Sequence, residues 1–392
     1  MLFTYLKSIT MDGIARLVII LIATMMITAC EREPAIEPSG KTISIGIIGP
    51  MSGDYLAKGQ EGIKGIEVAQ HIQPYLNNGD VMELVVKDDE NNPDQTASLI
   101  KWMAEEKKVA AILLLSTSAS ALKAGAYADS YKIPVLTLLA THTDVTKDRQ
   151  YISQLSFDNN FQGQVAAQFV KDDLLLDRVA VISDNDSFYS TELAGEFIRK
   201  FTAVGGIITG SLVVDQVSGN YAEALEKLKG GGTELLYMPI KADQVLQIIK
   251  AAKEIKWAPE LMGGDGLLAT VLNQYRDQVH YLEGMYATDF FSKHMPLTQY
   301  GDKARKMYES MFDSNISTYA GLGAEAHTVL QTAMNKCTAA ENRECINRNI
   351  RSTENLTGIA GRLAITGEGK GVRPLIINAI RRGELGYVVK VY

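Results

Sequence analysis

Three adjacent hydroxyl side chains, Ser116, Thr117 and Ser118, stand between an apolar run and a helical pattern. Hydroxyls and backbone N–H groups at a helix N-terminus can bind an anion, because the helix dipole places partial positive charge there. A ligand carboxylate would suit this cluster. The alternative is that one of the hydroxyls only caps the helix, and the sequence alone does not separate the two.

Signatures of catalysis are absent from the sequence. It contains no Gly-x-Ser-x-Gly elbow, no phosphate-binding Gly-x-x-x-x-Gly-Lys-Ser/Thr loop and no His-Glu-x-x-His pair. Gly230–Gly232 follows a helical pattern and is typical of a helix end. The histidines lack the spacing of metal ligands: His71, His142, His280, His294 and His327. We therefore expect no enzyme, no cofactor and no metal site.

Composition narrows the class of protein further. Of the 392 residues, 46% are hydrophobic and 22% charged, which predicts a substantial core and more than one lobe. The net charge is -7, and lysine and arginine are scattered along the chain. Because phosphate-backbone binding needs a concentrated basic field, nucleic acid is not an expected partner.

Strand and helix patterns alternate along the chain, which predicts an α/β fold with parallel sheets. The first series has expected strands at 42–48, 81–86, 110–115 and 135–139, and helices at 60–71, 96–106 and 120–131. The second has strands at 178–183, 207–214, 235–238 and 260–263, and helices at 161–174, 190–204, 222–229 and 242–253. Helices at 321–336 and 344–351 and strands at 375–380 and 387–391 complete the chain.

Ligands of open parallel sheets lie at the carboxyl ends of the strands. The segments that follow the expected strands here are small and polar. They are 49–53, 116–118, 140–141, 184–189, 240–241 and 264–265. We therefore expect ligand-binding residues among them.

The first 29 residues have the layout of a signal peptide, since Lys7 and Arg16 precede an apolar run at 17–28. That run is too short to span a bilayer, which takes about 20 residues. Residues 27–30 resemble a bacterial lipobox, which implies that Cys30 is lipidated. The alternative is an ordinary secretory signal. Residues 30–41 are polar and proline-containing, as expected of a tether.

Export makes the remaining two cysteines informative. Cys337 and Cys345 are eight positions apart across a polar stretch, and an oxidising compartment favours their pairing. We expect a small disulfide-closed loop. Two free thiols at helix ends are the alternative, and a zinc site is not expected because His327 is a full helix away.

Four motifs carry a family resemblance: residues 45–53, the acidic run 88–94, Gln162-Gly163 and residues 262–266. Their order resembles the type I periplasmic binding proteins of branched-chain amino acid uptake, the leucine/isoleucine/valine-binding family. The resemblance implies two Rossmann-like lobes joined by three crossover strands, near Asp158, Asp289 and Gly367. The first lobe would comprise residues 42–158 and 290–367, and the second residues 159–289 and 368–392.

The resemblance also implies residue roles. Thr117, Ser118, Ala140 and Thr141 match the positions that hold the α-carboxylate and α-ammonium of an amino acid. Asp265 matches the acidic residue that receives the ammonium. A surface turn in a Gly-Asp-Gly loop is the alternative for Asp265.

This sequence departs from the family pattern at the remaining site positions. Lys58 and Lys241 stand where amino-acid-binding members often carry tyrosine, and Phe188 stands at a third such position. If both lysines face the cleft, they favour a ligand with a second acidic group; solvated lysines at the rim are the alternative. Aromatic packing on the ligand is expected from Phe188, Tyr189 and Tyr319.

Together these features predict a monomeric, lipid-anchored binding protein at the periplasmic or cell-surface side of a bacterial membrane. Its expected partners are a small ligand and the permease of an ABC-type transporter. The alternative function is a ligand-sensing or envelope-interaction lipoprotein of the same fold without a permease. Glu31 after Cys30 permits outer-membrane sorting in a Gram-negative host, which would suit that alternative.

Overall fold

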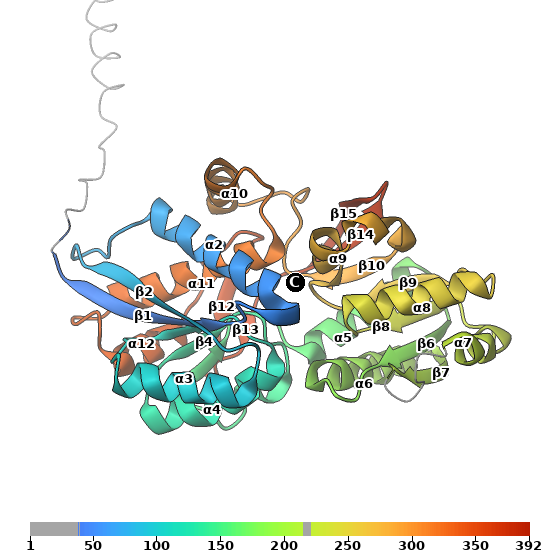
Figure 1. Cartoon of the computed structure of the whole chain (residues 1–392), viewed down its shortest axis with the longest axis horizontal. Coiled ribbons are helices and arrows are strands. Elements are labelled where there is room, and N and C mark those ends of the chain that lie inside the picture. The colour runs from blue at the N-terminus through green and yellow to red at the C-terminus, as the bar shows by residue number, and fades with distance from the viewer. Residues whose placement is uncertain (1–37, 39, 215–220) are drawn as a thin grey trace, which may run out of the picture. The chain divides into compact units, whose positions relative to one another are not determined.

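The computed structural model describes residues 38, 40–214 and 221–392, so the expected signal peptide, Cys30 and most of the tether lie outside the described residues. Two large β-sheets organise the described chain (Figure 1). The first has five strands in the order β2-β1-β3-β4-β5, and the second has seven in the order β15-β14-β10-β9-β8-β6-β7. The α/β prediction is confirmed.

The first sheet is parallel throughout and is covered on both faces. Helices α2 and α11 pack on one face, where Ile45 and Ile47 meet Ile66 and Leu322. Helices α3 and α4 cover the other face. The elements are β1 (Thr42–Gly49), β2 (Val81–Asp88), β3 (Ile112–Leu114), β4 (Val135–Thr137), β5 (Ile152–Gln154), α2 (Leu56–Ile72), α3 (Pro93–Glu105), α4 (Ser118–Tyr131) and α11 (Thr318–Asn335).

Helices α2 and α11 approach one another closely through glycine. A Cβ atom added at Gly65 would lie 1.9 Å from the carbonyl oxygen of Ala320, and one at Gly323 would lie 2.0 Å from that of Gly62. Only residues without a side chain allow this backbone contact. The close packing brings the N-terminal turns of the two helices together.

The second sheet is mixed rather than purely parallel, because β14 runs antiparallel to both of its neighbours, β10 and β15. Helices α5 and α6 cover one face, and α7, α8 and α9 cover the other. The strands are β6 (Arg178–Ser183), β7 (Ile207–Val213), β8 (Leu235–Met238), β9 (Glu260–Gly263), β10 (Tyr286–Asp289), β14 (Leu375–Arg381) and β15 (Glu384–Val391). The helices are α5 (Asn159–Gln168), α6 (Phe188–Ala203), α7 (Tyr221–Gly230), α8 (Ala242–Glu254) and α9 (Leu267–Gln274).

Several elements escaped the sequence pattern. Strands β5 and β10 have only three and four residues, too few for a clear apolar run. Helix α10 (Gln299–Phe312) buries only Gly301, Ala304 and Tyr308, so its apolar face is narrow. The expected helix at 161–174 is divided, since α5 ends at Gln168 and a π-helical turn, η3 (Phe169–Asp173), follows it.

Three chain segments that connect the two sheets pack against one another. The rings of Phe157, after β5, and Phe290, after β10, stack with centroids 4.4 Å apart. The guanidinium of Arg373, just before β14, lies 5.4 Å from the Phe290 ring centroid. Arg373 also forms a 2.7 Å ion pair with Glu325 of α11, and both side chains are 2% exposed. The junction between the sheets is therefore a packed aromatic and ionic cluster.

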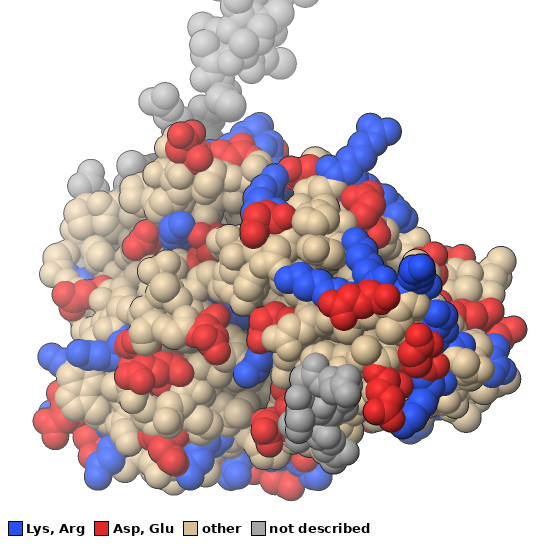
Figure 2. Space-filling model, turned by 45° about the vertical axis from the view of Figure 1, so that its right-hand side comes forward, with Lys and Arg blue, Asp and Glu red and all other residues tan. Residues whose placement is uncertain are grey.

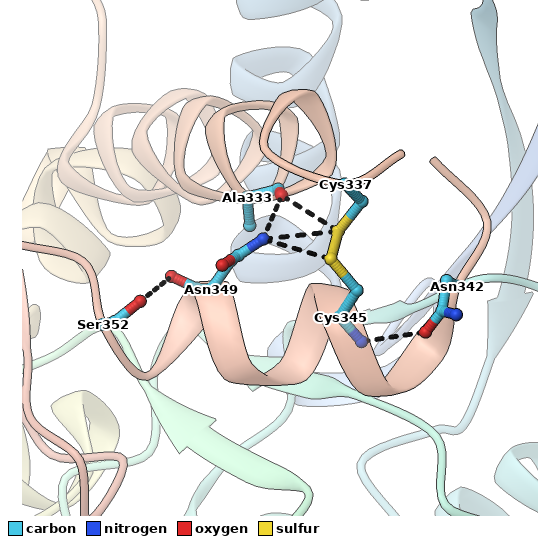
Figure 3. The surroundings of a disulfide bond; sticks show 6 residues. All are labelled: Ala333, Cys337, Asn342, Cys345, Asn349 and Ser352. Atoms are coloured by element: carbon cyan, nitrogen blue, oxygen red, sulfur yellow. Dashed lines mark hydrogen bonds between the residues drawn. A yellow bond between two sulfur atoms is a disulfide. The ribbon is translucent and has the colours of Figure 1, made fainter. Parts of the chain in front are cut away.

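A disulfide joins Cys337 and Cys345, which confirms the pairing expected from the sequence (Figure 3). It links the end of α11 to α12 (Arg343–Ile350). The side-chain amide of Asn349 donates to the Ala333 carbonyl at 3.0 Å and contacts both sulfur atoms. The bond therefore fastens the C-terminal end of α11 to the first turn of α12.

Surface charge is mixed in sign. Basic and acidic side chains alternate on the face shown in Figure 2, with no broad basic area. Within the described ranges, no helix is both long and apolar enough to cross a bilayer.

A small third sheet lies beside the connecting segments; its strands are β11 (Leu356–Thr357), β12 (Arg362–Ile365) and β13 (Gly371–Val372).

Candidate functional site

A cavity of about 740 Å³ is lined by loops and helix ends from both sheets. From the first-sheet side come α2, the loop before it, the start of α4 and Tyr319 of α11. From the second-sheet side come the segments after β6, β8 and β9. Eight predicted site residues line it: Lys58, Thr117, Ser118, Phe188, Tyr189, Lys241, Asp265 and Tyr319. Such convergence at strand ends is where ligands of open α/β sheets lie.

The N-terminus of α4 opens into this cavity. Thr117 is the N-cap residue, but its side chain makes no capping hydrogen bond. The Ser118 hydroxyl oxygen accepts the backbone N–H groups of Thr141 and His142, each at 3.3 Å, so its own proton is available for another acceptor. Of the two interpretations of the hydroxyl cluster, the structure disfavours simple capping. The first turn offers uncommitted donors to an anion.

Ala140 and Thr141 do not line the cavity. The Ala140 carbonyl accepts hydrogen bonds from Gln154 and Ser156, and both predicted residues are fully buried. The Thr141 backbone N–H is used to orient Ser118. These two residues therefore support the cavity wall from behind, whereas Leu139, just before them in the same loop, lines the cavity. Ser116 is likewise directed elsewhere, donating to the buried Asp89.

Asp265 stands on the opposite wall, in the loop after β9. The side-chain amide of Gln162 donates to its carboxylate at 2.9 Å, and the Tyr189 hydroxyl also hydrogen-bonds to it. Desolvation raises the pKa of Asp265, and these two hydrogen bonds together with the charge of Lys58 offset part of that shift. Asp265 is therefore not a free turn residue. It is an oriented carboxylate that faces the cavity.

Glycines on both sides of Asp265 let two tyrosines approach it. A Cβ at Gly264 would lie 2.0 Å from the Tyr189 hydroxyl oxygen, and one at Gly266 would lie 2.4 Å from that of Tyr319. Gly266 also has a φ of +69°, which favours glycine. The Tyr319 hydroxyl donates to the Gly266 carbonyl at 3.0 Å and lies 2.9 Å from the Thr270 hydroxyl. Tyr319 therefore ties α11 to the second-sheet wall.

Lys58 is the basic group of the inner wall. Its ammonium nitrogen lies 5.3 Å from the ring centroid of Tyr55 and 5.4 Å from that of Tyr319, both within cation–π range. Burial lowers the pKa of Lys58, and attraction to Asp265 and Asp289 opposes that shift. The side chain is thus held between two aromatic rings beside the cavity.

The cavity rim is acidic and aromatic. Lys241 is exposed, and its charge acts on the Tyr55 hydroxyl together with those of Asp54, Asp184 and Asp243. The Phe188 side chain also lies at the rim, where it is 60% exposed. Lys241 therefore fits the alternative of a solvated rim lysine better than that of an inner-wall cation.

Sequence reasoning did not assign three residues that shape the site. Tyr55 flanks Lys58, Asn91 accepts the Thr117 backbone N–H at 2.9 Å, and Gln162 orients Asp265. Gln162 also donates to Thr288 at 2.7 Å. Tyr55 follows the first strand closely, and Asn91 and Gln162 belong to the motifs quoted for the resemblance, so those signals could have found all three.

Comparison with known proteins decides the family. The family model described as periplasmic binding protein matches residues 42–383, which is most of the chain. The chain belongs to the periplasmic binding protein family. An amino acid binding protein of Pseudomonas aeruginosa is 23% identical over 256 residues, which are 63% of this chain and 66% of that protein's length.

Solved periplasmic binding proteins share the fold. A leucine-binding protein from Thermotoga maritima has a TM-score of 0.82 and 24% identity, covering 89% of this chain and 98% of its own. An isoleucine complex of a branched-chain amino acid transporter substrate-binding protein from Streptococcus pneumoniae has a TM-score of 0.79 and 22% identity, covering 90% and 100%. A solute-binding protein from Rhodopseudomonas palustris with 3,4-dihydroxybenzoic acid has a TM-score of 0.78 and 19% identity, covering 89% and 97%.

The type I periplasmic binding protein architecture is thereby confirmed. These relatives are solute-binding proteins, not enzymes. In this periplasmic binding protein, no group of three or more histidine, cysteine or acidic side chains within the described ranges is placed to hold a metal ion. The described residues that line the cavity offer hydrogen-bonding groups and charges of both signs.

Proposed function

We propose that this chain is the extracytoplasmic ligand-binding lipoprotein of an ABC-type uptake system. It binds an amino acid or a related small polar metabolite between two lobes, residues 42–158 with 290–367 and residues 159–289 with 368–392. Lipidation of Cys30 anchors it to the membrane, and it works as a monomer that delivers its ligand to a permease. Family membership and the amino acid ligands named for several relatives support this proposal.

The observation that carries the proposal is that one wall of the cavity suits a negatively charged group and the opposite wall suits a positively charged group. The uncapped N-terminus of α4, with Thr117 and Ser118, suits a carboxylate. Asp265, oriented by Gln162 and hydrogen-bonded to Tyr189, suits an ammonium. Because the two walls belong to different sheets, a zwitterionic ligand that contacts both would favour the closed arrangement of the lobes.

The test is a thermal-shift screen of the purified protein against amino acids, amides, polyamines, dicarboxylates and aromatic acids. A ligand that binds only the folded state raises the melting temperature. Isothermal titration of the best hit then compares wild type with Thr117→Ala and Asp265→Asn. Each variant should weaken binding by about 1.5 to 3 kcal/mol, because it removes a charge-assisted hydrogen bond. Unchanged dissociation constants in both folded variants would contradict the site.

The second candidate is a ligand-sensing or envelope-interaction lipoprotein without a permease, and Glu31 after Cys30 favours it in a Gram-negative host. Membrane fractionation of the lipidated protein separates the two. Uptake through an inner-membrane permease requires the protein to be found with the inner membrane, whereas recovery with the outer membrane supports the sensing function.

A further inference from the structure

We propose that Lys58 is a specificity-determining residue that binds a second carboxylate of the ligand, so that the preferred ligand is an acidic amino acid or a close analogue. This inference rests on the proposed function and refines its ligand class. It concerns the inner wall of the same cavity, on the side formed by α2 and α11.

The position of Lys58 is set by the fold rather than by side-chain freedom alone. It lies in the first turn of α2, and the glycine contacts between α2 and α11 place it next to Tyr319. Tyr55, three residues earlier, lies on its other side. The ammonium group of Lys58 therefore lies within cation–π range of two aromatic rings and borders the cavity.

Lys58 forms no ion pair with an acidic side chain of the described residues. Within the described part of the chain, no Asp or Glu oxygen is within the 4.0 Å ion-pair distance of its nitrogen. Lys64, two turns further along the same helix, shows the usual arrangement: it pairs with Glu61 at 2.8 Å and also lies over an aromatic ring, that of Phe312. A lysine at an inner wall without a counter-ion is costly unless something else supplies the negative charge.

The ligand can supply that charge, and the remaining polar groups of the cavity indicate which ligand group does so. The N-terminus of α4 is suited to one carboxylate, and Asp265 to an ammonium. Lys58 comes from a third element, α2, and faces the same cavity. Its partner is therefore a further anionic group. Lys241 is a weaker candidate, because it is exposed and shares the rim with three aspartates.

The electrostatics agree with this assignment. Burial lowers the pKa of Lys58, which means that its charged form is disfavoured in the empty site. A ligand carboxylate in contact with the ammonium would restore the charged form, as an opposite charge at close range does. The cost of keeping Lys58 desolvated is then recovered on binding of an anion.

The experiment is isothermal titration with two isosteric pairs, L-glutamate with L-glutamine and L-aspartate with L-asparagine, and with L-leucine. Wild type, Lys58→Met and the control Lys64→Met are compared after circular dichroism has shown each to be folded; Lys58→Gln replaces the methionine variant if that one does not fold. In wild type, one acid should bind about ten- to a hundredfold more tightly than its amide. Lys58→Met should reduce that ratio to less than threefold, and Lys64→Met should leave it unchanged.

The outcomes separate the inference from the proposed function. Wild-type protein that binds leucine or an amide as tightly as either acid would overturn the role of Lys58 while leaving the amino acid site in place. An acid preference that survives in Lys58→Met would also overturn it. Folded wild-type protein that binds none of the five compounds at millimolar concentration would overturn both the inference and the amino acid assignment.

Discussion

Two pairs of opposite charges lie inside the described chain, and they are arranged differently. Glu325 and Arg373 contact each other at 2.7 Å, and each side chain is 2% exposed. Lys58 and Asp265 attract each other as well, but they border a cavity from opposite walls and form no ion pair. The first pair is neutralised by its own contact and belongs to the junction between the sheets. The second leaves its charges available, which is the arrangement expected of a binding site.

The largest expected effect comes from breaking the ion pair between Glu325 and Arg373. Arg373→Met leaves the Glu325 carboxylate buried without its counter-ion, which should lower the free energy of unfolding by about 3–5 kcal/mol. Urea denaturation measures this loss. The double variant Glu325→Gln/Arg373→Met is the control, since it removes both charges and should recover much of the stability. A loss below about 1 kcal/mol in the single variant would contradict this role and show that the Glu325–Arg373 pair, like Lys58 and Asp265, is not needed for stability.

The buried side chain of His327 extends the comparison of the two charge pairs to a titratable group without a partner among the described residues. Both ring nitrogens of His327 lack a hydrogen-bond partner among the described residues, and burial lowers its pKa to about 4. The unfolded chain binds a proton near pH 6.5, but the folded chain does not. Stability should therefore fall as the pH drops from about 6.5 to 4, by at most about 3 kcal/mol from this residue.

Another group acts in the opposite direction, so a variant is needed to isolate His327. Burial raises the pKa of Asp289 to about 7, which stabilises the folded state as the pH falls below that value. Urea denaturation of wild type and His327→Leu from pH 8 to pH 4 cancels this contribution. The variant should gain stability relative to wild type as the pH falls. A difference that does not depend on pH would contradict a neutral, buried His327.

Removing the disulfide, which is remote from the cavity, should lower stability without changing ligand binding. Replacing Cys337 and Cys345 with alanine opens a short loop, for which chain entropy predicts a loss of about 2–3 kcal/mol in the free energy of unfolding. The dissociation constant of the best ligand should stay the same, because α12 lies outside the cavity lining. Denaturation and titration of the same preparation measure both quantities. Weakened binding would mean that this region is coupled to the site.

The smallest effect is expected at the rim. Lys241→Met should change the affinity for an acidic ligand by less than about threefold, because solvent and the nearby aspartates already screen this charge. Titration alongside Lys58→Met makes the comparison direct. A larger effect at Lys241 than at Lys58 would reverse the roles of the two lysines.

Much of the fold and part of the site followed from local sequence features. Strand–helix alternation predicted the α/β class, and the rule that ligands lie at strand ends pointed to Thr117, Ser118 and Asp265. The same rule also pointed to Ala140 and Thr141, which do not line the cavity, because the backbone groups of this loop bond to Ser118, Gln154 and Ser156. That choice depends on tertiary hydrogen bonding.

The difference between the two lysines also required the structure. Lys58 and Lys241 occupy similar positions in the sequence pattern, each near the start of a helix that follows a strand. Only the packing of α2 on α11 places Tyr319 beside Lys58, whereas Lys241 shares the cavity rim with Asp54, Asp184 and Asp243. Tyr319 lies 261 positions after Lys58 in the sequence, so no local pattern records their contact.

The most direct test of the charges at Lys58 and Asp265 is urea unfolding of wild type and of the double variant Lys58→Met/Asp265→Asn. Each protein is measured with and without the best ligand of the thermal-shift screen. Without ligand, the two proteins should differ by less than about 1 kcal/mol. At a ligand concentration one hundred times the wild-type dissociation constant, wild type should gain about 2.7 kcal/mol and the variant almost nothing. A variant that loses several kcal/mol without ligand, or that keeps the ligand-induced gain, would contradict a pair of charges reserved for the ligand.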